Sequence, residues 1–254
     1  MSFGQHVLFL LSVGIAGYVQ NLTGFAFGLV LLGLVGLTHA ASIPDVANVV
    51  GMLTLVNAAM LFAAVRPRFE TRVLGPTLAA SLIGVLGGVW LLNWLSHGLL
   101  VVMTLLLGLT IIGCAATLAR PASALARLSS PASFAAFGAA SGVLGGVFST
   151  AGPPLVYHLY RQPMPLPAIR ETLVAVFAAN ALLRLALLLP SGHVSANAML
   201  LSLETVPLVL VQTWWMARNP PGIRPSTAKR LACLLMALVG IGLVLSSWRQ
   251  LAPF

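Results

Sequence analysis

The chain has 254 residues, of which 59% are hydrophobic and only 7% are charged. Soluble proteins carry about 25% charged residues, so this composition excludes a soluble domain. The net charge of +9 comes from cations that stand mainly in short loops between apolar runs. Arginine in such loops is typical of cytoplasmic loops that face anionic lipid. We therefore expect a multi-pass membrane protein that does not bind nucleic acid.

Eight apolar segments follow one another along the chain, separated by Pro, Arg or His. They cover residues 3–37, 44–65, 73–95, 98–119, 132–160, 167–190, 194–217 and 229–249. As single helices, the first and the fifth would measure about 50 Å and 45 Å, against a hydrocarbon core of about 30 Å. Both contain glycine and polar residues near the middle, so we expect each to be a broken or re-entrant hairpin.

The loop cations give a separate test of the two hairpins. If all eight segments cross the membrane once, these cations divide six against six between the two sides. If the first and fifth segments each turn back, eleven share one side, Arg249 lies opposite and Arg184 lies inside the membrane. The positive-inside rule favours the second arrangement and places the eleven cations in the cytoplasm and both termini outside.

This topology makes the chain a duplication. Each half contains one hairpin followed by three crossings, and an odd number of crossings inverts the second half relative to the first. Pro44 is followed thirteen residues later by Asn57, and Pro167 thirteen residues later by Asn180, while Gly17 matches Gly142 at a nearby offset. We predict an all-α membrane protein with an inverted repeat. The first repeat covers residues 1–119, a cytoplasmic connector residues 120–130, and the second repeat residues 131–254.

Two stretches resemble the signatures of a known family. Residues 142–157, Gly-Val-Leu-Gly-Gly-Val-Phe-Ser-Thr-Ala-Gly-Pro-Pro-Leu-Val-Tyr, with Arg170-Glu-Thr-Leu and residues 180–184, resemble the second-half signature of the sulfite exporter TauE/SafE family. Residues 20–28 resemble the less glycine-rich variant of its first signature, without the triple glycine that many members show. The resemblance implies a secondary carrier of small sulfur-containing or organic anions, such as sulfite or sulfonates, in a bacterial inner membrane. In such a membrane, the outside location of both termini that the positive-inside rule favours is the periplasm.

The two hairpin tips are the expected anion-binding region. Irregular backbone at membrane depth is tolerated only where protein or a water-filled cavity satisfies its polar groups, and half-helix N-termini offer amides to an oxyanion. The alternative is that the small residues of these tips only allow close helix packing. In the same way, Asn57 and Asn180 would only form hydrogen bonds between helices. The candidate substrate-binding residues are Gln20, Asn21, Thr23, Gly24, Phe25, Gly28, Asn57, Ser149, Thr150, Gly152, Pro153, Pro154, Tyr157, His158, Asn180 and Arg184.

Ionisable residues inside apolar segments are expensive and need individual interpretation. Arg184 either attracts an anion or snorkels toward the outer interface to pair with lipid or a carbonyl. Glu204 is a candidate proton-coupling carboxylate or an internal partner for Arg184, and the alternative is that the helix boundaries around it are misplaced. His158 is a second proton-coupling candidate, with packing as the alternative interpretation.

Other functions are disfavoured by what the sequence lacks. There is no His-Glu-x-x-His or Gly-x-Ser-x-Gly motif and only four acidic residues, so we expect neither an enzyme nor a cofactor. Cys114 and Cys233 lie in apolar segments without metal-ligand spacing, so we expect no metal site. The alternatives that stay open are an anion channel and a carrier of a non-sulfur organic anion. The expected partners are a small anion, the lipid bilayer and protons as coupling ion; a homodimer stays open, because a lipid-facing surface and a dimer face look alike in sequence.

Overall fold

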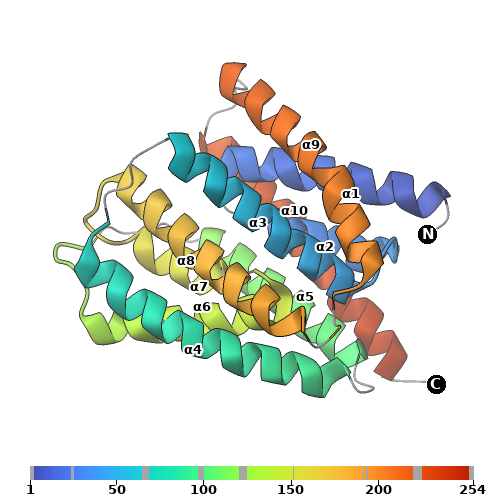
Figure 1. Ribbon diagram of the computed structural model, residues 1–254, viewed down its shortest axis with the longest axis horizontal. Coiled ribbons are helices and arrows are strands. Elements are labelled where there is room, and N and C mark those ends of the chain that lie inside the picture. The colour runs from blue at the N-terminus through green and yellow to red at the C-terminus, as the bar shows by residue number, and fades with distance from the viewer. Residues whose placement is uncertain are drawn as a thin grey trace. The chain divides into compact units, whose positions relative to one another are not determined.

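The structure of the chain is a computed structural model that describes residues 3–23, 26–64, 69–96, 100–119, 125–150, 152–190, 192, 194–219 and 225–251. These residues form α-helices and no strands (Figure 1). The helices are α1 (Phe3–Thr23), α2 (Phe27–Thr38), α3 (Ile43–Ala64), α4 (Thr71–Ser96), α5 (Leu100–Ala119), α6 (Pro131–Phe148), α7 (Gly152–Leu159), α8 (Leu166–Leu188), α9 (Ala196–Arg218) and α10 (Pro225–Leu251).

Eight of the helices in the described ranges are long and apolar enough to cross a membrane, and the chain is a multi-pass membrane protein. The predicted all-α fold is confirmed. The predicted breaks are also present, because the first segment is divided into α1 and α2 and the fifth into α6 and α7. With 12 and 8 residues, α2 and α7 are too short to span a bilayer as single helices.

The second of these segments folds back on itself. Ser130 caps the start of α6 by accepting a hydrogen bond from the backbone of Ser133, and Pro131 occupies the first turn. Twenty-five residues later, the His158 ring near the end of α7 lies 3.3 Å from the Ser133 hydroxyl. The chain therefore returns along α6 to the level where α6 begins. We call α6 and α7 the second hairpin, and α1 and α2, which also pack against each other, the first hairpin.

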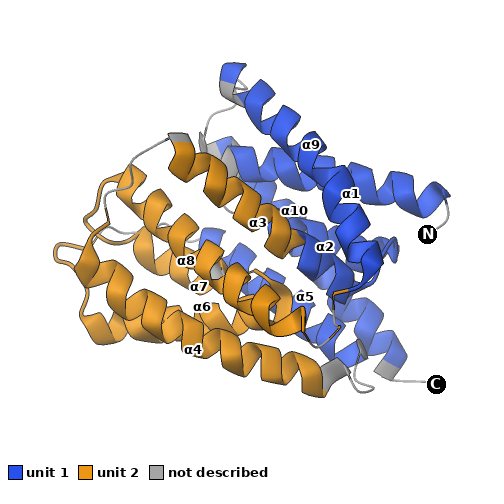
Figure 2. Cartoon of the chain, viewed as in Figure 1, with its two compact units in different colours: residues 1–49, 95–120, 195–254 blue, residues 50–94, 121–194 orange. Residues whose placement is uncertain are grey.

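The chain divides into two compact units (Figure 2). Unit 1 comprises residues 1–49, 95–120 and 195–254, and unit 2 comprises residues 50–94 and 121–194. The first hairpin belongs to unit 1 and the second hairpin to unit 2. Each unit thus contains helices from both halves of the chain, and the boundaries of the two repeats stay a prediction.

In unit 1, α5 and α10 pack closely and run antiparallel. A side chain at Gly108 would contact Leu243 and Val244, whereas one at Gly240 would contact Ile112. Moving forward along α5 therefore means moving backward along α10. Small residues at such contacts let membrane helices approach closely and gain van der Waals packing.

The first hairpin packs on α9, also in unit 1. His6 of α1 contacts Glu204, and eight residues further along both helices the Gln212 amide donates to the Gly14 carbonyl at 2.8 Å. Because both contacts advance together, α1 and α9 run parallel.

In unit 2, α4 and α6 run parallel with their backbones in close contact. Gly138 faces the Thr77 carbonyl, Gly142 faces Ser81, and a side chain at Gly146 would come within 2.5 Å of the Val85 carbonyl. The glycines on α6 and their partners on α4 recur every four residues, which keeps them on one face of each helix. These glycines therefore serve close helix packing, which is the alternative that the sequence left open for small residues.

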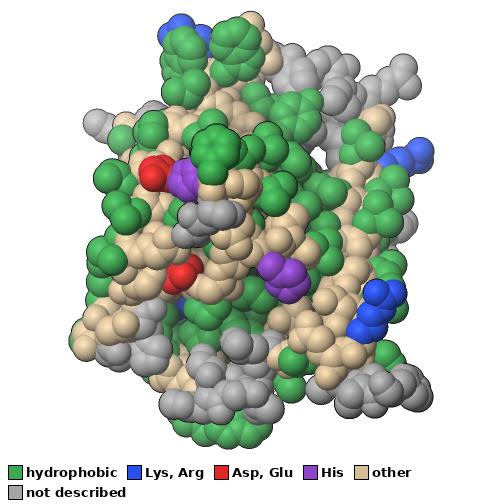
Figure 3. Space-filling model, turned by 90° about the vertical axis from the view of Figure 1, so that its right-hand side faces the viewer, with side chains coloured by type: hydrophobic (Ala, Val, Ile, Leu, Met, Phe, Trp, Pro, Cys, Tyr) green, Lys and Arg blue, Asp and Glu red, His purple; other side chains and the backbone are tan. Residues whose placement is uncertain are grey.

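Large apolar side chains also lie on the outside of the molecule. Trp90 and Trp94 on α4, Leu203 and Trp215 on α9 and Leu238 on α10 are more than half exposed. Figure 3 shows hydrophobic side chains over much of one face, with few charged groups among them. Contact with lipid accounts for such a surface.

Candidate functional site

The break between α6 and α7 combines backbone strain with buried polar groups. Ser149, which ends α6, has a φ of 55°, in the left-handed region that non-glycine residues rarely adopt. The hydroxyls of Ser149 and Thr150 are buried, and within the described part of the chain neither has a hydrogen-bond partner. An unsatisfied buried hydroxyl costs about 1–3 kcal/mol. Strain and orphaned polar groups together are typical of a ligand site.

A buried arginine lies beside this break. The Arg184 side chain of α8 is fully buried, and its Nε donates to the Gly146 carbonyl at 2.8 Å. Gly146 stands in the last turn of α6, where backbone carbonyls lack a donor within the helix. The burial of Arg184 does not fit a side chain that reaches the lipid interface, whereas the carbonyl partner named in the same interpretation is present.

Asn180 lies one turn before Arg184 on the same face of α8. Its amide donates to the Ser81 hydroxyl of α4 at 2.7 Å, and that hydroxyl lies 2.9 Å from the Asn180 carbonyl oxygen. From α3, a side chain at Gly51 would come within 3.3 Å of the Ser149 hydroxyl. Four elements of unit 2 therefore meet around the break. We call this group the break site: Gly51, Ser81, Gly146, Ser149, Thr150, Asn180 and Arg184.

His158 lies away from the break, at the base of the second hairpin. Its ring stacks on Phe137, with centroids 4.2 Å apart, and meets the edge of Phe134 at 5.0 Å. Gln162 donates to the His158 carbonyl and accepts from the backbone of Ser129, which ties the end of α7 to the segment before α6. The ring is nearly fully buried, and this aromatic packing supports the packing interpretation of His158.

The other predicted residues of the second hairpin lie along α7. Gly152 is buried, Pro154 is half-buried, and the side chain of Pro153 lies outside the described residues. The Tyr157 hydroxyl accepts a hydrogen bond from Arg161 at 3.2 Å. The predicted break is therefore present, but residues of the whole of α7 were expected in one site, whereas only the N-terminal end of α7 adjoins Thr150.

The first hairpin is described less completely. Gly24 and Phe25 lie outside the described residues, as does the side chain of Thr23. Gln20 is half-buried and Gly28 is buried in α2. The Asn21 amide donates to the Gly17 carbonyl of its own helix at 2.9 Å. Asn57 is half-buried on α3 and belongs to unit 2.

Glu204 has a partner that the sequence did not indicate. Its carboxylate lies 3.0 Å from Nε2 of His6, and the two side chains are 46% and 36% exposed. This contact joins α9 to α1 within unit 1. Three contact residues could not be predicted: Ser81, Gln212 and His6. Each of them contacts a helix that is distant in sequence. The sequence contains one signal for the contact of Ser81 with α6: the residues Thr77, Ser81 and Val85 recur at the four-residue spacing of the α6 glycines.

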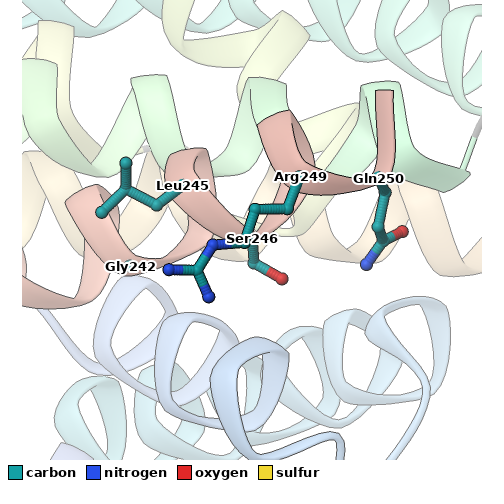
Figure 4. Close-up of a pocket in the computed structure, with 5 residues that line it drawn as sticks. All are labelled: Gly242, Leu245, Ser246, Arg249 and Gln250. Carbon is teal, nitrogen blue, oxygen red and sulfur yellow. The ribbon is translucent and has the colours of Figure 1, made fainter. Parts of the chain in front are cut away.

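Two surface hollows lie elsewhere. The first is lined by residues along one stretch of α10 (Figure 4): Gly242, Leu245, Ser246, Arg249 and Gln250. The second is lined by Thr71, Arg72, Pro76, Leu128, Ser129, Ser130 and Pro131. Neither contains a residue of the break site. Over the described ranges, no three His, Cys, Asp or Glu side chains gather in a way that suits a metal ion.

Comparison with known proteins gives two matches. A family model described as "Sulfite exporter TauE/SafE" matches residues 9–243. The chain is 30% identical over 239 residues to the "Probable sulfite/organosulfonate exporter TauE" of Cupriavidus necator, and the alignment covers 93% of each chain. No solved structure matches the chain.

Proposed function

This chain belongs to the sulfite exporter TauE/SafE family, and we propose that it is a secondary transporter that moves sulfite or a small organosulfonate across the bacterial inner membrane. The single observation that carries the proposal is the pair of buried hydroxyls at Ser149 and Thr150, beside the guanidinium of Arg184. Family membership points to transport and away from catalysis. The substrate class follows from the name of the relative and from the chemistry of the break site.

The break site has the donors that a sulfur oxyanion requires. Sulfite and sulfonates each present three oxygens on sulfur, which accept hydrogen bonds but donate none unless protonated. Serine and threonine hydroxyls can donate to such oxygens. Two prolines, Pro153 and Pro154, stand in the first turn of α7 and lack a backbone N–H, so this helix end offers few amides. The hydroxyls of Ser149 and Thr150 are therefore the expected donors to the anion.

Three helix contacts support the topology with two hairpins. If the second hairpin crossed the membrane once, α5 and α10 would run parallel; their antiparallel packing requires one more reversal between them. In agreement, the Ser195 hydroxyl before α9 donates to Asp45 in the first turn of α3 at 2.6 Å, so both helices start on the same side. The parallel course of α1 and α9 then requires the first hairpin to turn back as well. With both reversals, the positive-inside rule places the termini in the periplasm.

The inverted repeat is supported by equivalent contacts within each of the two units. In unit 1, Gly17 of the first hairpin faces Gln212, which lies five residues after Pro207 inside α9. In unit 2, Gly142 of the second hairpin faces Ser81, which lies five residues after Pro76 inside α4. Each hairpin thus packs on a proline-containing helix from the opposite half of the chain, at equivalent positions. We take the equivalence of these two contacts as support for an inverted repeat.

Proton coupling is assigned to Glu204, as the more accessible of the two candidates. Its half-exposed carboxylate at His6 can exchange protons, whereas His158 is enclosed by two phenylalanine rings. A carboxylate at membrane depth is expensive unless it has a function or a partner, and a proton that moves with the substrate gives it one.

The proposed function is tested by transport into proteoliposomes. Uptake of sulfite and of several small sulfonates and carboxylates is measured with and without a pH gradient, and liposomes without protein serve as control. We expect saturable uptake of a sulfur oxyanion that the gradient accelerates. No uptake of any of these anions by folded protein would refute the proposal, and flux without saturation would indicate a channel.

The break site is tested by Thr150→Val, which removes an orphaned hydroxyl and keeps the size of the side chain. We expect the KM for the transported anion to rise about tenfold, the worth of one hydrogen bond to a charged group. Stability should hold, because no hydrogen bond within the described protein is lost. The matched control is Thr172→Val on α8, whose side chain is also buried and whose hydroxyl donates to the Ala168 carbonyl of its own helix. Equal transport by both variants would place the anion elsewhere.

A further inference from the structure

We propose that Arg184 promotes anion binding at the break site through the carboxyl end of α6, as a positioning residue and not as a ligand of the anion. The inference rests on the proposed function, because it assigns a role within the same site. It names the group on which Arg184 acts, the Gly146 carbonyl, and the property that it changes, the electrostatic potential at Ser149 and Thr150.

The location of the site creates an electrostatic problem. A helix carries a partial negative charge of about half an electron at its carboxyl end, where the last carbonyls lack donors. Ser149 ends α6 and Thr150 follows directly, so an anion held by their hydroxyls lies against this negative end. A helix end of this polarity repels an anion, and the unpartnered hydroxyls alone do not remove that repulsion.

The contacts around the last turn of α6 show how the protein compensates. The Gly145 carbonyl accepts from the Ser149 backbone at 2.9 Å, which closes the helix in the usual way for a left-handed terminal residue. The next carbonyl, that of Gly146, accepts from Nε of Arg184 at 2.8 Å. A cation at the carboxyl end of a helix offsets its dipole, and burial strengthens the effect because water does not screen it.

Glycine at position 146 fits this arrangement. A side chain there would come within 2.8 Å of the Gly88 Cα and within 2.5 Å of the Val85 carbonyl, so α4 fixes the last turn of α6 from one side. The guanidinium from α8 binds the carbonyl of the same residue. The end of α6 is therefore held by α4 and neutralised by α8, which leaves the following two hydroxyls at a helix end that tolerates an anion.

Two substitutions separate the hydrogen bond from the charge. In Arg184→Gln the amide nitrogen stands the same number of bonds from Cα as Nε of arginine, so the donor to Gly146 is kept and the charge is lost. Arg184→Lys keeps a charge and a donor but lacks the planar fork of the guanidinium. Sulfite uptake into proteoliposomes gives KM and maximal rate for each, and Thr172→Val is the control for a buried change on α8.

If Arg184 acts through the helix end, Arg184→Lys keeps a KM within about threefold of the unaltered protein, and Arg184→Gln raises KM about tenfold at an unchanged maximal rate. Loss of binding in both variants would overturn the inference, because it would mean that the guanidinium binds the anion directly in a bidentate manner. An unchanged KM in Arg184→Gln, or a fall in maximal rate and melting temperature alone, would also overturn it. If Arg184→Gln does not fold, the KM of Arg184→Lys still tests the inference: a value within about threefold supports it, and a loss of binding overturns it. Absence of uptake by the unaltered protein would instead refute the proposed function.

Discussion

The close packing of α4 on α6 can be tested by Gly142→Ala. The added methyl group would contact the Ser81 carbonyl oxygen and lie 2.8 and 2.9 Å from the Ser81 carbonyl carbon and Cα. Ordinary contacts of a methyl group begin near 3.4 Å. The backbone of α4 therefore has to move by about half an ångström or more, in a segment fixed by the same contact one turn before and after.

The expected loss of stability follows from two opposing contributions. Overpacking costs about 1–3 kcal/mol, and backbone contacts on both sides place this substitution at the upper end. Alanine has a higher helix propensity than glycine, which stabilises the folded protein by up to about 1 kcal/mol. The net loss of about 2 kcal/mol corresponds to a fall in melting temperature of about 4–8 °C for a chain of this size. Transport should fall as well, because Ser81 also holds Asn180.

The assay is thermal unfolding of purified protein in detergent, followed by sulfite uptake. The control is Gly87→Ala on the same helix α4, where nothing lies within 4 Å of the added methyl group. That variant should match or exceed the unaltered protein in melting temperature. If Gly142→Ala and Gly87→Ala have the same melting temperature, α4 and α6 are not packed through their glycines.

Three further predictions concern single contacts. Ser149→Gly should raise the melting temperature by a few degrees, because glycine adopts the left-handed conformation without the cost of about 1–2 kcal/mol that serine bears, and a lower melting temperature would contradict this assignment. A double-mutant cycle of Ser81→Ala and Asn180→Ala should give a coupling energy of about 0.6 kcal/mol and at most about 1.7 kcal/mol, whereas additive losses would argue against the contact. Glu204→Gln should change the free energy of unfolding by less than about 1 kcal/mol, because the pair with His6 is half exposed. The same variant should abolish the stimulation of uptake by a pH gradient. If the gradient still stimulates uptake, Glu204 does not couple transport to protons.

The break between α6 and α7 could be predicted because its causes are local. A segment of about 45 Å does not fit the bilayer as one helix, and glycine and proline near its middle mark where it ends. Arg184 could be singled out for a similar reason, since a charge in an apolar segment is rare. Both signals are visible in a short stretch of sequence without knowledge of the fold.

The partners of these residues could not be predicted, because they depend on which helices pack together. Ser81 meets Asn180 from a helix ninety-nine residues away, and the acceptor for Arg184 is a backbone carbonyl, which every residue possesses. For the same reason, composition alone did not separate the two interpretations of the glycines. Gly142 and Gly146 are packing residues because α4 lies against them, and this contact is not written in either segment alone.

Counterflow is the assay that distinguishes a carrier of sulfur oxyanions with alternating access from a channel. Proteoliposomes are loaded with unlabelled sulfite and diluted into a trace of sulfite labelled with ³⁵S, without any ion gradient. A carrier returns loaded with labelled substrate each time it releases unlabelled substrate, so we expect a transient accumulation of label above the external concentration. Label that only equilibrates, at a rate independent of internal sulfite, would rule out alternating access and indicate a channel.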